Sequence, residues 1–117
     1  MNVNPEIQKL EEITGLPVSP DVYPYDGSKY ITYEYTDERG TFWGDDHALD
    51  DQATIRVNLF TPPKTNYMEY KHQIRDYLET IGIVDEITSW LETFTAKNNL
   101  EKTVRRTIIL VTITKAR

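Results

Sequence analysis

The ten residues FWGDDHALDD, from Phe42 to Asp51, contain four aspartates and one of the two histidines of the chain. Carboxylates and imidazole can bind metal ions or transfer protons, so this stretch is the first candidate for chemistry. Its spacing lacks the alternating ligands, central glycine and terminal glutamate of an EF-hand, and it holds no paired-histidine motif. Aspartates between strands commonly bond their own backbone in solvated turns. We therefore expect an exposed acidic loop that contacts a partner, without a metal or a catalytic role.

The rest of the sequence marks no other reactive group. It contains no cysteine, which excludes disulfides, thiol catalysis and thiolate zinc sites. No nucleophile motif accompanies His72, and the single glycines form neither a phosphate-binding loop nor a dinucleotide motif. We expect no cofactor and no enzymatic activity.

Charge and hydropathy narrow the classes of partner. The formal charge is −6, from 13 basic and 19 acidic residues, which argues against broad neutralisation of a nucleic-acid backbone. No apolar run approaches the roughly 18 residues of a membrane-spanning helix, and the polar, acidic N-terminus does not resemble a signal peptide. We expect a soluble, non-exported protein that binds neither membrane nor specific nucleic acid.

Aromatic residues supply a second candidate for binding. The sequence has eight tyrosines, and tyrosine and tryptophan are enriched at protein interfaces because each joins an apolar face to a polar tip. Tyr23 and Tyr25 in the proline-rich connector are difficult to bury together with Phe42 and Trp43 at the base of the acidic loop. The predicted partner interface therefore comprises Tyr23, Tyr25, Phe42, Trp43, Asp45, Asp46, Asp50 and Asp51.

The length of 117 residues predicts one domain, 1–117. Apolar residues at three-residue spacing predict an N-terminal helix over 4–14, which Gly15 ends. Three prolines then predict an irregular connector over 15–29. An α+β core follows over 30–117.

Periodicity predicts the elements of that core. KYITYEYT and QATIRVNLFT alternate apolar and polar residues, which indicates an antiparallel hairpin with a long acidic connection. Apolar residues with helical spacing predict a helix from Tyr67 to Ile81, with Gly82 as its stop. The segment from Ile83 to Phe94 fits either a helical stripe or a threonine-rich strand; we favour the strand, because TVRRTIILVTITK needs a neighbour.

These elements predict an α+β fold in the order helix, strand, strand, helix, strand, strand. Its sheet is expected to be four-stranded and antiparallel, built from two hairpins, with the long helix packed on one face.

The order of elements resembles a known family. YITYEYTD, an acidic loop, ATIRVNLFTPPKTNYMEYKHQIRDYLETIGI and a closing pair of strands resemble the tail-terminator, or tail-completion, proteins of long-tailed bacteriophages and Gram-positive prophages. The resemblance spans Tyr30 to Lys115 and rests on element order and loose patterns such as Y-x-Y and K-x-x-I-R-x-x-L.

The resemblance implies a structural protein of the virion, at the interface of head and tail, that waits in the host cytoplasm before assembly. Its partners would be further copies of itself in a ring, commonly a hexamer, together with the tail tube protein and a head-completion or connector protein. Two alternatives stay open: a small adaptor that binds one protein as a monomer or dimer, and a metal-dependent enzyme centred on the acidic stretch.

Overall fold

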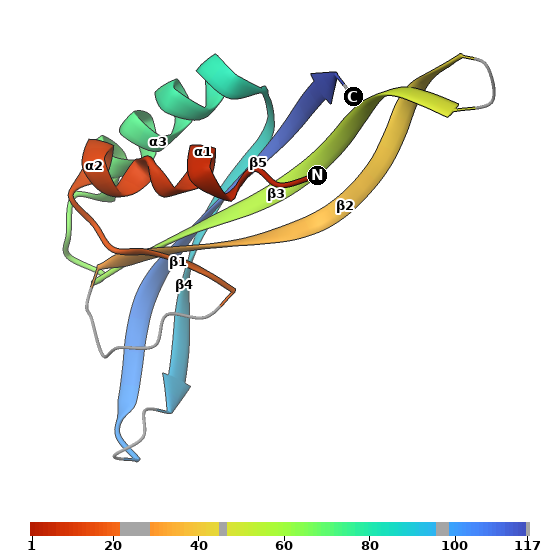
Figure 1. Ribbon diagram of the computed structural model, residues 1–117. Helices are drawn as coiled ribbons and strands as arrows, with labels where there is room; N and C mark the ends of the chain where they lie inside the picture. Colours follow the sequence, from red (N-terminus) through yellow and green to blue (C-terminus); the bar gives the residue numbers. More distant parts are fainter. Residues whose placement is uncertain (22–28, 45–46, 96–98, 117) are drawn as a thin grey trace.

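The computed structural model describes residues 1–21, 29–44, 47–95 and 99–116, with the backbone alone for 39–44 and 47–49. Five strands form one mixed sheet in the order β1-β2-β3-β5-β4, and three helices lie on one face of it (Figure 1). The elements are α1 (Asn4–Gln8), α2 (Leu10–Thr14), β1 (Val18–Pro20), β2 (Tyr30–Gly44), β3 (His47–Thr61), α3 (Tyr67–Ile81), β4 (Ile83–Thr95) and β5 (Glu101–Ala116).

The predicted four-stranded antiparallel sheet is wrong, because the proline-rich connector contributes a fifth strand. β1 pairs with β2 in parallel, with Val18 opposite Ile31. The backbone N–H of Ile31 donates to the carbonyl of Pro17 over 2.8 Å, and that of Asp21 donates to the carbonyl of Tyr33 over 2.8 Å. A strand next to proline is tolerated here because β1 lies at the edge of the sheet, where a missing N–H breaks no ladder.

The N-terminal segment also differs from the prediction. Instead of one helix over 4–14 it forms two short helices that meet at Lys9, where ψ is −18° and the regular ladder is interrupted. Gly15 ends α2 in the left-handed conformation, with φ +74°, as a helix-terminating glycine does. The helical layer is therefore shared by α1, α2 and α3, and no single long helix covers the sheet.

The strands and helix after residue 60 follow the prediction more closely. α3 has the predicted bounds, and Ile83–Thr95 is the strand that was favoured over a helix. Gly82, however, acts by close approach: its φ is −170°, and an added Cβ would lie 2.4 Å from the carbonyl oxygen of Thr112. No side chain larger than hydrogen fits between the end of α3 and β5 at this point.

One apolar core lies between the helices and the sheet. The N-terminal segment contributes Val3, Ile7 and Leu10, and α3 contributes Ile74 and Leu78. The sheet contributes alternate residues of its central strands: Ile31, Tyr33, Ala53, Ile55, Val57, Leu59, Ile109, Val111 and Ile113. Strands of 15 or 16 residues continue beyond this core, so the ends of the two hairpins extend away from the helices (Figure 1).

Candidate interaction surface

The predicted acidic loop is mostly strand. The ladder between β2 and β3 continues to Gly44 and His47, with Thr41 opposite Asp50. A register shift between Tyr35 and Asp37 lets β2 continue through residues 37–40, because a bulge absorbs the extra residue. The stretch is therefore the outer part of a long hairpin.

The structure places the described residues of the predicted interface on two paired strands of one hairpin. Phe42 and Trp43 lie on β2, while Asp50 and Asp51 lie on β3 and are half-buried, with Asp51 opposite Lys115 in the register. Tyr23, Tyr25, Asp45 and Asp46 lie outside the described residues. Their role as an interface stays a prediction.

The structure tests the metal hypothesis only in part, because Asp45 and Asp46 lie outside the described residues. Among the described residues no group of three or more histidine, aspartate or glutamate side chains could hold a metal ion. Within these ranges there is also no helix long and apolar enough to cross a membrane.

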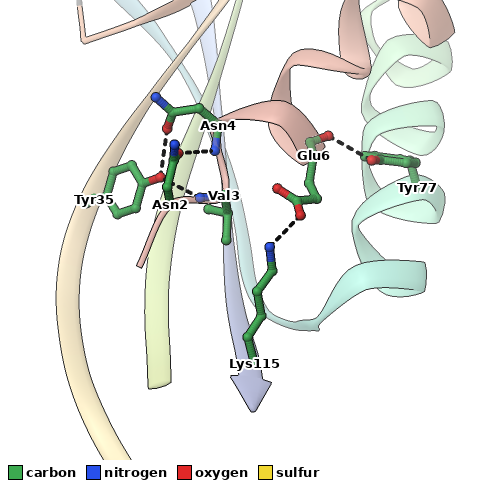
Figure 2. Close-up of polar contacts among 7 residues, drawn as sticks. All are labelled: Asn2, Val3, Asn4, Glu6, Tyr35, Tyr77 and Lys115. Atoms are coloured by element: carbon green, nitrogen blue, oxygen red, sulfur yellow. Dashed lines mark hydrogen bonds and ion pairs between the residues drawn. The ribbon is translucent and has the colours of Figure 1, made fainter. Parts of the chain in front are cut away.

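Polar contacts fix the N-terminal segment to the sheet (Figure 2). The backbone N–H of Val3 donates to the hydroxyl oxygen of Tyr35 over 2.9 Å, and that hydroxyl donates to Oδ1 of Asn4 over 2.7 Å. Because Val3 itself is fully buried, its N–H would lack a partner without Tyr35. Tyr35 therefore holds the start of the N-terminal segment against the sheet.

Glu6 connects the same segment to β5 and α3. Lys115 donates from Nζ to Oε1 of Glu6, and the hydroxyl of Tyr77 donates to the Glu6 carbonyl over 2.7 Å (Figure 2). The hydrogen bond from Lys115 holds the pKa of the Glu6 carboxyl below its ordinary value. Burial, with a smaller effect from the nearby Glu6 charge, raises the pKa of Tyr77. Both shifts favour the protonation states that hold the segment in place at neutral pH.

The face of the sheet opposite the helices carries an aromatic row across four strands. Tyr30 lies opposite Phe60, Phe60 opposite Arg106, and Arg106 opposite Trp90, so the four side chains share one face. The rings of Tyr30 and Phe60 stack with centroids 4.8 Å apart. The Arg106 guanidinium lies 5.5 Å from the Phe60 centroid and 5.7 Å from that of Trp90. We call these four residues the aromatic row.

Arg106 also joins this row to polar neighbours. It forms an ion pair with Glu92 over 3.6 Å and donates to Oδ1 of Asn58 over 3.1 Å. Asn58 in turn donates to the hydroxyl of Thr32 over 3.2 Å. These contacts hold the aromatic row in one arrangement. A partner could therefore bind it without rearranging its side chains.

β4 is the exposed edge of the sheet. It pairs only with β5, and its large apolar side chains remain exposed: Ile83, Ile87, Trp90, Leu91 and Phe94. Leu91 is 53% exposed and Trp90 38%. The register places Ile87 and Leu91 on the helical face and Trp90 and Phe94 on the opposite face. A long edge with exposed apolar side chains is a template for pairing with another chain, and the ladder of β4 is regular beyond the register shift between Val84 and Glu86.

This exposed edge was not predicted, although the sequence carries a signal for it. The segment fitted a helical stripe as well as a strand because its apolar residues fall on both faces of the strand. Three carboxylates, Asp85, Glu86 and Glu92, interrupt it, which argues against a strand buried on both sides. Apolar residues on both faces combined with such charges indicate a strand completed by a partner.

Comparison with solved structures identifies a protein of similar fold. No family model matches the chain, and no curated protein matches it. A solved structure whose name states no function matches with a TM-score of 0.52 and 12% identity, over 98% of this chain and 94% of the other. At that identity the likeness shows a shared fold alone. The tail-terminator family is not shown by any of these comparisons.

Proposed function

We propose that this chain is a structural subunit of the head-to-tail connection of a long-tailed phage, a tail terminator or connector that assembles into a ring. The proposed ring, a hexamer in the resembling family, caps the tail tube and joins it to the head. Its partners are further copies of the chain, the tail tube protein and a head-completion or connector protein. The role requires shaped surfaces and no active site.

The observation that carries the proposal is the extension of the sheet beyond its helical cover. The radius of gyration is 15.9 Å, whereas a compact domain of this length has about 13.4 Å. The principal extents are 57 × 27 × 22 Å, and the two hairpins extend beyond the helices (Figure 1). Projecting hairpins provide contact area for neighbours, as ring subunits with two unlike lateral surfaces require.

Two further features support the proposal. The order hairpin, helix, hairpin from β2 to β5 agrees with the order on which the family resemblance rests. The aromatic row adds a preformed surface on the face opposite the helices.

The native mass of the purified protein across concentration tests the proposal, with negative-stain images of any large species. Closed rings, formed alone or with the tail tube protein, are the expected result. A monomer at every concentration, with and without that tube protein, would contradict it and would favour the adaptor that binds a single protein.

A paired set of variants locates the contact. Asp45→Ala with Asp46→Ala changes the stretch predicted to form an interface, and we expect fewer rings and less joining of heads to tails. Glu12→Ala with Glu79→Ala removes two exposed carboxylates from α2 and α3 instead, and serves as the control for net charge. Equal ring yield from both pairs would exclude residues 45–46 from the contact.

A further inference from the structure

The outer side of β4 presents 13 residues of backbone with a neighbour on one side only. Alternate N–H and C=O groups of such a strand point away from the sheet and can pair with an added strand. The exposed apolar side chains on both faces would be covered by the side chains of that strand. The edge therefore has the backbone and the apolar surface that an extended segment requires.

Charge decides which segment fits. From Ile83 to Thr95 the strand carries Asp85, Glu86 and Glu92 and no lysine or arginine. Arg106 balances Glu92, whereas Asp85 and Glu86 are exposed and have no ion-pair partner among the described residues. A strand added next to them gains from lysine or arginine opposite these carboxylates.

The same charges disfavour a second copy of this chain. Pairing β4 with β4 so that Ile87 lies opposite Leu91 also brings Glu86 opposite Glu92. The other accessible edge, on β2 beyond β1, carries three acidic residues, Glu34, Asp37 and Glu38, and one basic residue, Arg39. Like charges opposite each other destabilise a strand pair. Both self-pairings bring acidic residues together, so both are disfavoured.

We propose that β4 binds an extended, basic segment of another protein, which joins the sheet as a sixth strand. Its apolar residues cover Ile87 and Leu91 on the helical face. On the opposite face it contacts Trp90 and Phe94, and its basic residues lie near Asp85 and Glu86. The inference goes beyond the proposed ring, because an adaptor would use the same edge.

A capped peptide of about twelve residues that alternates valine with lysine is the probe. In a Trp43→Phe background Trp90 is the single tryptophan, so its fluorescence reports on β4. We expect saturable binding, weakened by salt, and slower hydrogen exchange of β4 amides by about tenfold on binding. A peptide with glutamate for lysine, and one with two prolines that cannot pair, should both fail to bind.

Two variants test the charge and the apolar contact of the edge. Glu86→Gln should weaken binding about two- to fivefold, and Leu91→Lys about tenfold or more. Ile13→Lys is the matched control, since Ile13 on α2 is 38% exposed and lies away from the edge, and it should bind as the parent does.

Three results would overturn the proposal. Equal binding of the glutamate peptide would remove the charge argument, and exchange protection outside β4 would place the segment elsewhere. Self-association of the protein alone that Leu91→Lys abolishes would show that a second copy occupies the edge. Ring formation has a separate readout, so a failure here leaves the ring proposal to be decided by native mass.

Discussion

The two edges of the sheet are finished in opposite ways. At one edge β1 pairs with residues 31–33 of β2, ends at Pro20 and buries Val18 against Ile31. β4 forms the other edge with 13 residues and leaves its large apolar side chains exposed. Short strands and proline protect an edge from unwanted pairing, whereas a long apolar strand invites it. The difference indicates that one edge serves folding and the other serves binding.

The packing of the two edges supports this division. β1 follows the N-terminal segment, whose Val3, Ile7 and Leu10 are part of the core. From β4 only Val84 packs against that core. Substitutions on β4 should therefore alter mainly the exposed surface, whereas substitutions near β1 should lower the stability of the fold.

The same substitution on both edges should give the largest contrast. Val18→Lys places a charge at a buried position, so we expect the free energy of unfolding to fall by about 2–4 kcal/mol. Leu91→Lys adds a charge at an exposed position and should change it by less than about 0.5 kcal/mol. Urea denaturation of both variants measures the difference. Equal losses would show that β4 also stabilises the monomer and would remove the contrast.

A pair of glycines tests how each edge is attached. Gly82 lies directly against β5, so Gly82→Ala forces β4 away from its neighbour and should cost about 1–3 kcal/mol. Gly15 precedes β1 with φ +74° and open space around it, so Gly15→Ala should cost about 1 kcal/mol, from backbone strain alone. Thermal unfolding ranks the two variants. A smaller loss of stability for Gly82→Ala would mean that β5 shifts at Thr112 to accommodate the added methyl group.

Lowering the pH should first weaken the attachment of the N-terminal segment, which precedes β1. We expect this to be the smallest of the three effects on stability. Because the pKa of Glu6 is lower in the folded protein, its contribution is present above about pH 4.5 and is lost as pH falls through the folded pKa. Glu6→Gln should therefore lose stability at neutral pH, by less than about 1 kcal/mol, and show a shallower decline below pH 4.5. Unfolding curves from pH 7 to 3 measure this slope, and Glu12→Gln is the control. If stability declined with pH as steeply in Glu6→Gln as in the parent, the contact with Lys115 would not contribute to stability in acid.

The central strands were predictable because each signal lies within a few residues. Alternation in KYITYEYT and QATIRVNLFT placed Ile31, Tyr33, Ile55 and Val57 on one face, and all four are buried in the core. Helical spacing likewise gave the bounds of α3.

The order of the strands, and hence which strands form the edges, was not predictable, because strand order is a long-range property. The prolines around Val18 obscured a parallel pairing with Ile31 for which the sequence has no local signal. The partner interface was assigned to aromatic residues of the connector and the loop base and to the aspartates of the acidic stretch, while Trp90, Leu91 and Phe94 were assigned to an ordinary strand. Their exposure follows from β5 lying between β3 and β4, which the pattern of β4 alone does not encode.

The contact between Glu6 and Lys115 has a consequence for synthesis, since 109 positions separate the two residues. A ribosome adds about 5–20 residues per second, so Lys115 follows Glu6 by roughly 5–22 s. During that interval the apolar side of the N-terminal segment has no β5 beneath it, and β3 and β4 have no strand between them. The nascent chain must therefore remain open, and accessible to chaperones, until its last strand has left the ribosome.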